Sequence, residues 1–180
     1  MYTRNLLWLV SLVSAAPLYA ADIPANTPLA PQQVFRYNNH SDPGTLDPQK
    51  VEENTAAQIV LDLFEGLVWM DGEGQVQPAQ AERWEILDGG KRYIVHLRSG
   101  LQWSDGQPLT AEDFVLGWQR AVDPKTASPF AGYLAQAHIN NAAAIVAGKA
   151  DVTSLGVKAT DDRTLEVTLE QPVPWFTTML

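Results

Sequence analysis

Two alternating segments separated by a glycine-rich turn constrain the fold more than any other part of the chain. In Arg92–Leu97, apolar residues alternate with more polar ones, as in a β-strand with one buried face. A similar segment, 83–87, precedes it, and Asp88-Gly89-Gly90 lies between the two. Aspartate and glycine tolerate the backbone angles that tight turns require. The sequence therefore predicts an antiparallel hairpin at this position.

The remaining pattern mixes short strands and helices without a regular β-α-β alternation. Such a mixture predicts an α+β fold. A second hairpin is expected around Asp161-Asp162, and 172–176 resembles the opening of another helix that Leu180 leaves uncapped, which suggests a fragment. The expected strands are 32–38, 67–70, 83–87, 92–97, 157–159 and 164–169, and the expected helices are 54–64, 110–123 and 140–147.

Two of these helices carry start signals and an apolar stripe. Thr110 and Asp113 approximate a capping box, with aspartate in the usual place of glutamate. The earlier helix has Asn54 or Thr55 as a candidate cap. Its apolar residues recur at helical spacing, which predicts a buried face formed by Ala57, Val60, Leu61 and Phe64.

The first residues have the layout of a secretory signal. Arg4 precedes a short apolar core, 6–13, and small Ala20 stands where cleavage is expected. The core is too short to span a bilayer comfortably, because a membrane helix needs about 20 residues. The sequence thus predicts a signal peptide over 1–20, removed on export to the periplasm. With no cysteine in the chain, neither a lipid anchor nor a disulfide is available to the mature protein.

Composition and motifs argue against several functions. Asp and Glu number 21 against 12 Lys and Arg, without a basic stripe, which disfavours nucleic acid as a partner. The three histidines, which lack metal-ligand spacing, predict no metal site, and no cofactor motif is present. The adjacent carboxylates Glu52-Glu53 and Asp161-Asp162 do not distinguish an acid from a base. We therefore expect no enzyme and no cofactor.

Tryptophan is abundant for a chain of this size. Trp69 and Trp84 fall in expected strands, and Trp118 falls on the apolar face of an expected helix. We interpret these as core residues rather than as stacking platforms for a ligand. Trp103 precedes the turn Ser104-Asp105-Gly106 and is expected to fix that turn against the core.

Several motifs in series resemble one protein family. The segment 95–114, with Trp103-Ser104-Asp105-Gly106 at its centre, resembles the signature of the family 5 extracellular solute-binding proteins. Thr45-Leu46-Asp47-Pro48 is similar to that family's motif near the mature start. The segments 62–67, 118–131, 155–159 and 172–176 continue the resemblance, and 118–131 is closer to the oligopeptide and murein-peptide binders than to the dipeptide binders.

The resemblance implies a two-lobed periplasmic-binding-protein fold with an extra mixed α/β subdomain. Residues 21–64 would begin the first lobe and 65–180 would form the extra subdomain, while the second lobe would lie outside this sequence. The implied function is capture of short peptides for an ABC importer, whose permease subunits would be the partners of a monomer. An extended peptide can pair its backbone with an exposed strand edge, which gives affinity without dependence on side-chain identity.

The same resemblance selects candidate ligand-binding residues. The loop after the Leu-Asp-Pro motif falls on Glu52, Glu53, Asn54 and Thr55. Glu52 matches an acidic residue of the family's cleft, whereas the next three depart from the family's Gly-hydrophobic-Pro pattern and could instead cap the following helix. Phe130 stands where oligopeptide binders often have tyrosine, so it retains a ring and loses a hydroxyl.

Other readings stay open beside peptide binding. Within the family, the solute could be an oligosaccharide or a metal chelate. The chain could also be a truncated product without binding activity, because an enclosed site loses much of its desolvation when one wall is missing.

Overall fold

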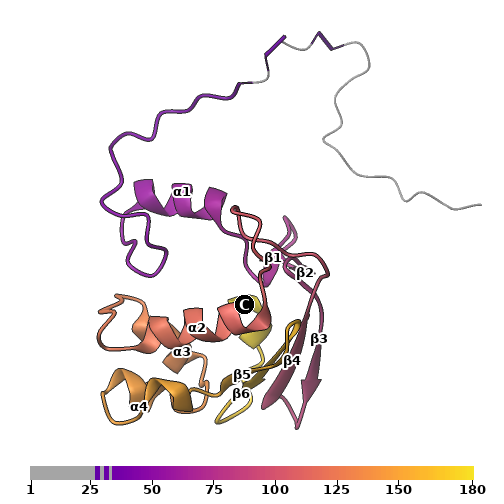
Figure 1. Ribbon diagram of the computed structural model, residues 1–180, viewed down its shortest axis with the longest axis vertical. Helices are drawn as coiled ribbons and strands as arrows, with labels where there is room; N and C mark the ends of the chain where they lie inside the picture. The colour runs from indigo at the N-terminus through magenta and orange to yellow at the C-terminus, as the bar shows by residue number, and fades with distance from the viewer. Residues whose placement is uncertain (1–26, 29–30, 33) are drawn as a thin grey trace, which may run out of the picture. The chain divides into compact units, whose positions relative to one another are not determined.

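The computed structural model describes residues 27–28, 31–32 and 34–180 (Figure 1). The predicted signal peptide, 1–20, lies outside these residues. The chain divides into a unit of Met1–Asn38 and a unit of Asn39–Leu180. In the described part of the first unit, the rings of Phe35 and Tyr37 stack with centroids 6.0 Å apart. Among the described residues, no helix has both the length and the apolar character to cross a membrane.

The second unit contains all the regular elements that are labelled in Figure 1. Its helices are α1 (Asn54–Leu63), α2 (Ala111–Val122), α3 (Ala131–Gln136) and α4 (Ala142–Val146). Its strands are β1 (Val68–Met70), β2 (Val76–Pro78), β3 (Ala81–Leu87), β4 (Arg92–Leu97), β5 (Val157–Asp161) and β6 (Thr164–Thr168). Short 3₁₀ turns are η1 (Val152–Ser154) and η2 (Phe176–Met179).

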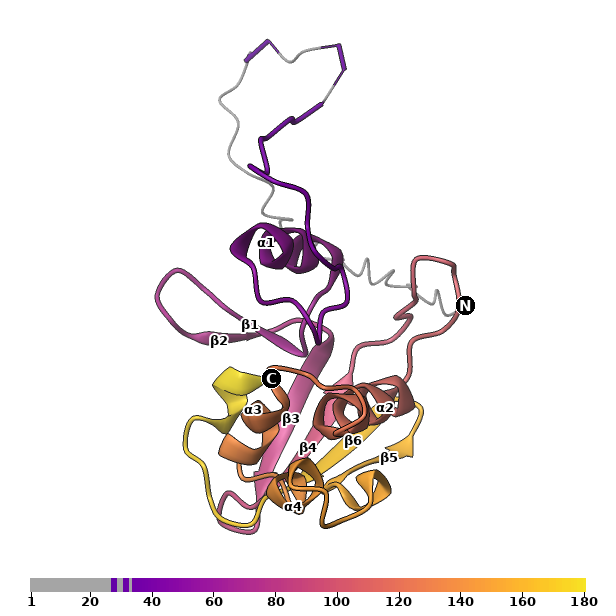
Figure 2. The same ribbon diagram turned by 90° about the vertical axis from the view of Figure 1, so that its left-hand side faces the viewer.

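A four-stranded antiparallel sheet organises this unit, in the order β3-β4-β6-β5. In its central pairs, Val95 lies opposite Trp84 on one side and Leu165 on the other. β1 and β2 form a separate two-stranded ribbon. Helices α2, α3 and α4 cover one face of the larger sheet, and α2 packs against β5 and β6 (Figures 1 and 2).

The core lies between this sheet face and the helices. Tyr93, Val95 and Leu97 are buried while their neighbours along β4 are not, which confirms the predicted alternation. The helices contribute Val115, Ala142 and Ile145, among others, from the opposite side. The helices therefore bury one sheet face, as expected of an α+β domain with helices on one side of an antiparallel sheet.

Both predicted hairpins and the capping box are confirmed. The turn joining β3 to β4 has positive φ at Asp88, Gly89 and Gly90, and the turn joining β5 to β6 places the Arg163 N–H on the Asp161 carboxylate at 2.8 Å. At the start of α2, Asp113 Oδ2 accepts hydrogen bonds from both the N–H and the hydroxyl of Thr110, at 2.7 and 3.0 Å.

The strand predicted over 32–38 is wrong for its described part, because residues 34–38 adopt no regular structure. Val34, Phe35 and Tyr37 are all exposed. A strand needs a neighbour to complete its hydrogen bonds, and no strand in the described chain pairs with this segment. Alternation alone therefore did not determine the structure here.

The helical predictions need smaller corrections. The helix expected over 140–147 is the five-residue α4, which begins at Ala142 because Asn140 and Asn141 belong to the preceding turn. α3 was not predicted, since Ala131–Gln136 is too short to display a helical period. The segment 172–176 leads into a 3₁₀ turn, η2, and not into an α-helix.

The tryptophans divide between core and surface. Trp84 and Trp118 are half-buried against the core, as predicted. Trp69 is 54% exposed, so its assignment to the core is wrong. Its strand, β1, belongs to the separate two-stranded ribbon, and Met70 of the same strand is exposed as well. Trp103 is 41% exposed and is not among the residues packed against the core, so it does not fix its turn there as predicted.

Candidate ligand-binding site

The Leu-Asp-Pro motif forms a compact turn that begins the site. Asp47 accepts a hydrogen bond from the Gln49 N–H through its side chain at 3.1 Å, and from the Lys50 N–H through its carbonyl at 2.9 Å. The Asp47 N–H in turn donates to the Thr45 hydroxyl at 3.1 Å. Aspartate and threonine commonly stabilise turns through such local bonds. The motif therefore fixes its own backbone and presents Gln49 toward α2.

Arg120 of α2 joins this turn to the body of the unit. Its guanidinium donates to both carboxylate oxygens of Asp47, at 2.9 and 2.6 Å, and to Gln49 Oε1 at 2.6 Å. Gln49 Nε2 donates to the Gly117 carbonyl at 2.6 Å. A bidentate arginine-carboxylate pair has a defined geometry. We call Asp47, Gln49 and Arg120, with these bonds, the arginine clamp.

The clamp also shifts the pKa of its carboxylate. Hydrogen bonding from Arg120 lowers the pKa of Asp47 from 3.8 to about 2, against the opposing effect of partial burial. A lowered folded-state pKa means that Asp47 stabilises the folded chain above about pH 4. That contribution is lost progressively as the pH falls from 3.8 toward 2.

We expect Asp47→Asn to lower the melting temperature at neutral pH and to change it little near pH 2, because most of the stabilisation by the native carboxylate has been lost there. The measurement is thermal unfolding by circular dichroism between pH 7 and pH 2. Arg120→Gln provides the control, since Asp47→Asn added to it should have little further effect. An Asp47→Asn effect that is equal at every pH would contradict the assigned ion pair.

A second contact positions Phe130 beside the clamp. The Ser128 hydroxyl donates to the Gln49 carbonyl at 2.6 Å, and the same oxygen accepts the Phe130 N–H at 3.2 Å. Ser128 is buried, whereas the Phe130 side chain is 51% exposed. The ring is therefore held by its backbone at a defined place while much of its surface stays open to solvent.

These residues border a pocket of about 320 Å³ between the turn, α2 and α3. We call it the aromatic pocket, because rings from Trp118, Phe130 and Tyr133 contribute to its walls. Its remaining lining residues are Pro48, Gln49, Gly117, Ala121, Ser128 and Leu134. Rings with a few fixed polar groups are typical of small-molecule sites. The aromatic pocket can therefore bind an apolar or planar group.

Of the predicted site residues, one lines the aromatic pocket and four do not. Phe130 lies in the aromatic pocket, but Glu52, Glu53, Asn54 and Thr55 do not line it. Glu52 and Asn54 are exposed, and the Glu53 carboxylate accepts the Gly44 N–H at 3.0 Å. Glu53 precedes α1 as its N-cap without a side-chain cap, so the alternative in which Asn54 or Thr55 caps the helix is wrong.

Sequence reasoning missed Gln49, Trp118 and Tyr133 as lining residues. Both Pro48 and Trp118 belong to motifs that the family resemblance contains, which was the available signal. Their proximity depends on contacts such as Gln49 to Arg120, which are 71 residues apart in the sequence. A separation of that length leaves no trace in local periodicity.

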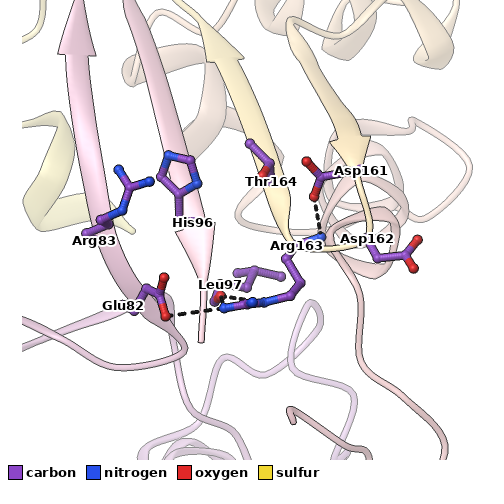
Figure 3. Close-up of a pocket in the computed structure, with 8 residues that line it drawn as sticks. All are labelled: Glu82, Arg83, His96, Leu97, Asp161, Asp162, Arg163 and Thr164. Atoms are coloured by element: carbon purple, nitrogen blue, oxygen red, sulfur yellow. Dashed lines mark hydrogen bonds and ion pairs between the residues drawn. The ribbon is translucent and has the colours of Figure 1, made fainter. Parts of the chain in front are cut away.

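A larger cavity of about 580 Å³ lies at the sheet end, where β3, β4 and the β5-β6 turn meet (Figure 3). Its charged groups are largely paired with one another or with the backbone. Arg163 donates to the Leu97 carbonyl at 2.6 Å and to Glu82 at 3.2 Å, and Arg83 pairs with Glu85 at 2.6 Å. Because these side chains are paired, we interpret the charged cavity as structural and not as a ligand-binding site.

His96, which borders the charged cavity, also has a partner. Its Nε2 lies 3.0 Å from Glu85 Oε1, and hydrogen bonds from Arg83 and His96 lower the pKa of Glu85. The histidine is therefore a satisfied, partly exposed strand residue. Within the described residues, no group of three or more His, Cys, Asp or Glu side chains is arranged to hold a metal ion.

Comparison with known proteins agrees with this geometry, which suits binding. Residues 75–180 match the model of the bacterial extracellular solute-binding proteins, family 5 Middle. The chain is 99% identical over 180 residues, all of its length, to the probable deoxycholate-binding periplasmic protein YgiS of Escherichia coli (strain K12), of which it covers 34%. It is 49% identical over 172 residues, 96% of its length, to the periplasmic oligopeptide-binding protein OppA of Salmonella typhimurium, covering 32% of that protein.

A solved structure shares the fold. The Haemophilus influenzae OppA complex with the peptide RPPGFSPFR matches with a TM-score of 0.74 and 43% identity, over 78% of this chain and 28% of that one. The predicted α+β fragment of a periplasmic-binding-protein fold is thereby confirmed. The chain spans about a third of the length of these curated relatives.

The fold and the family match place the chain in a class of binding proteins. The chain belongs to the bacterial extracellular solute-binding proteins of family 5, which are binding proteins and not enzymes.

Proposed function

We propose that this chain forms one wall of the solute-binding cleft of a periplasmic protein that delivers its solute to an ABC importer. The observation that carries the proposal is the aromatic pocket, whose Phe130 is held by Ser128 and Gln49 yet remains half exposed. A side chain that is fixed and uncovered is available for contact with a ligand. Family membership supplies the class of function.

The proposed organisation follows the family resemblance. Residues 1–20 act as a cleaved signal peptide, 21–64 begin the first lobe and 65–180 form the extra subdomain. The whole protein acts as a monomer in the periplasm and docks on the importer's permease subunits. The periplasmic names of the relatives support this location.

For the solute, we propose deoxycholate. The name of the 99% identical relative supports this choice. Deoxycholate has a rigid apolar ring system and a single carboxylate, and burial of ring surface would supply most of its affinity. The walls that Trp118, Phe130 and Tyr133 give to the aromatic pocket suit such a surface. Phe130, where oligopeptide binders often have tyrosine, also makes this wall less polar.

A short peptide is the second candidate. Its support is the 49% identity to an oligopeptide-binding protein and the likeness to a structure with bound peptide. Glu52 and Asn54 are exposed and Thr55 is half-exposed, so their loop remains accessible to a peptide backbone. Glu53 would contribute only its backbone, because its carboxylate already holds Gly44.

The test is calorimetry on a chain of the length of the 99% identical relative, with deoxycholate and with a pool of tri- to pentapeptides as titrants. We expect deoxycholate to bind, and Phe130→Ala to weaken binding about tenfold or more, since it removes most of a ring's apolar contact. Trp69→Ala serves as the matched control, because Trp69 is exposed and lies outside the aromatic pocket.

The outcomes separate the two candidates. Heat with peptides alone, together with weaker peptide binding by Glu52→Ala, would replace deoxycholate with the peptide assignment. Binding of either solute with equal affinity in Phe130→Ala and wild type would remove Phe130 from the site. No heat with either titrant would overturn both solute assignments.

A further inference from the structure

Ser128 is the only polar residue that the described part of the chain buries, at 9% exposed. Its hydroxyl donates to the Gln49 carbonyl at 2.6 Å and accepts the Phe130 N–H at 3.2 Å. Burial of a hydroxyl is unfavourable unless hydrogen bonds compensate for it. Both bonds of Ser128 are made to backbone groups, so this side chain ties together two segments that lie far apart in the sequence.

The segment on one side begins α3. Phe130 precedes this helix as its N-cap, a position whose N–H has no acceptor within the helix. Ser128 supplies that acceptor through its side chain. The Phe130 ring is 51% exposed, so the packing of its side chain alone gives it limited support. The hydrogen bond from its backbone therefore carries much of what fixes the ring.

The segment on the other side is fixed by the arginine clamp. Arg120 donates to Gln49 Oε1 at 2.6 Å and is itself paired with both carboxylate oxygens of Asp47. Neither Arg120 nor Asp47 lines the aromatic pocket. A chain of hydrogen bonds thus runs from the arginine clamp, through Gln49 and the buried Ser128, to the backbone of Phe130.

We propose that Ser128 is a positioning residue for solute binding, which holds the Phe130 ring in the place where the solute meets it, and that Arg120 acts on the solute through the same chain. A binding group that is already fixed loses less conformational entropy when its ligand arrives. The inference rests on the proposed function and deepens it. It assigns part of the affinity to a hydrogen bond behind the ring, whichever of the two solutes is bound.

The test is a double-mutant cycle measured by calorimetry with deoxycholate, on a chain of the length of the 99% identical relative. We expect Ser128→Ala to weaken binding by about 2- to 10-fold, as ordering one side chain on binding would cost. In a Phe130→Ala background the same change should have little further effect. Ser154→Ala is the matched control, because its hydroxyl also donates to a carbonyl, that of Asp151, at 2.6 Å, outside the aromatic pocket. Its affinity should equal that of wild type.

Arg120→Gln interrupts the chain at its other end and leaves the Ser128 hydroxyl in place. We expect it to weaken binding by about twofold, again only while the Phe130 ring is present. Circular dichroism establishes that each variant is folded at the temperature of the titration. Unchanged affinity in Arg120→Gln would remove the arginine clamp from the inference.

A second readout needs no solute. Hydrogen exchange of the Phe130 amide, followed by NMR, should become about tenfold faster in Ser128→Ala and stay unchanged in Ser154→Ala. Unchanged exchange in Ser128→Ala would overturn the positioning role. A loss of affinity that is equal with and without the Phe130 ring would also overturn it, and would assign Ser128 to direct contact with the solute. If wild type binds no solute while the exchange still responds, the proposed function fails and the fixed position of Phe130 stands.

Discussion

Replacing Gly156 with alanine is expected to destabilise the folded chain by about 3 kcal/mol, toward the upper end of the range for overpacking. A methyl group at this position would lie 2.6 Å from Asn140 Cβ and 2.7 Å from the Thr168 carbonyl oxygen. The residues that carry both obstacles are held by backbone hydrogen bonds. The Gly156 N–H donates to the Asn140 carbonyl at 2.9 Å, and the Thr168 N–H donates to the Gly156 carbonyl at 2.8 Å.

The backbone cannot easily move away from the added methyl. Asn140 N–H also donates to the Thr168 carbonyl at 3.0 Å, so three segments are joined at one crossing. Alanine would lower the entropy of the unfolded chain, a gain of only about 0.4–1 kcal/mol. The free-energy cost of the steric clash is larger than this gain, so the net effect is destabilising. This crossing joins the segment before α4 to the residue before β5 and to the last residue of β6, so its loss would loosen the helical layer.

Urea unfolding followed by circular dichroism measures the effect. Gly72→Ala is the control, because Gly72 lies in a turn with no heavy atom within 4 Å of the added methyl. We expect that variant to stay within about 0.5 kcal/mol of wild type. A Gly156→Ala protein as stable as Gly72→Ala would show that the three segments are not as close as the structure places them.

Local chemistry made much of the fold predictable. The hairpin at Asp88-Gly89-Gly90 was predicted because those residue types favour positive φ, which the structure shows at each of them. The start of α2 followed from Thr110 and Asp113, whose hydrogen bonds need only neighbouring atoms. In both cases the determining contacts lie within a few residues of one another.

Elements that depend on a distant partner were not predictable in the same way. The stripe containing Leu61 correctly indicated a helix, but it could not reveal that this face lies open in the 180-residue chain. Trp69 looked like a core residue because its type is usually buried, but β1 lies in a separate two-stranded ribbon, where Trp69 and Met70 are both exposed.

The candidate site likewise contains one residue that was predicted and long-range contacts that were not. Phe130 was selected through the family resemblance, and the structure gives it a fixed backbone and an open ring. The arginine clamp was not predicted, although Asp47 and Arg120 both lie in motifs that carry the resemblance. An ion pair between residues 73 positions apart leaves no periodic signal. A side-chain role for Glu52 stays a prediction that the calorimetry of Glu52→Ala addresses.

Replacing Phe176 with alanine is expected to have the largest effect among these substitutions, about 3–5 kcal/mol, as for other large-to-small changes in cores. The Phe176 side chain is 1% exposed. Its ring packs against Tyr93 with centroids 4.6 Å apart, in a tilted arrangement. Tyr93 belongs to β4, so the cavity left by the ring would open on the inner face of the central sheet.

The adjacent residue supplies the control. Trp175 is also aromatic but 58% exposed, so Trp175→Ala should cost less than about 1 kcal/mol. Thermal unfolding should show a lower melting temperature for Phe176→Ala by roughly 10 °C or more and little change for Trp175→Ala. Because η2 packs against β1, loss of Phe176 should also weaken the hydrogen bond from Leu67 to Leu180. Faster hydrogen exchange at Leu67 in Phe176→Ala, but not in Trp175→Ala, would link this ring to the start of β1; equal melting temperatures for the two variants would contradict its place in the core.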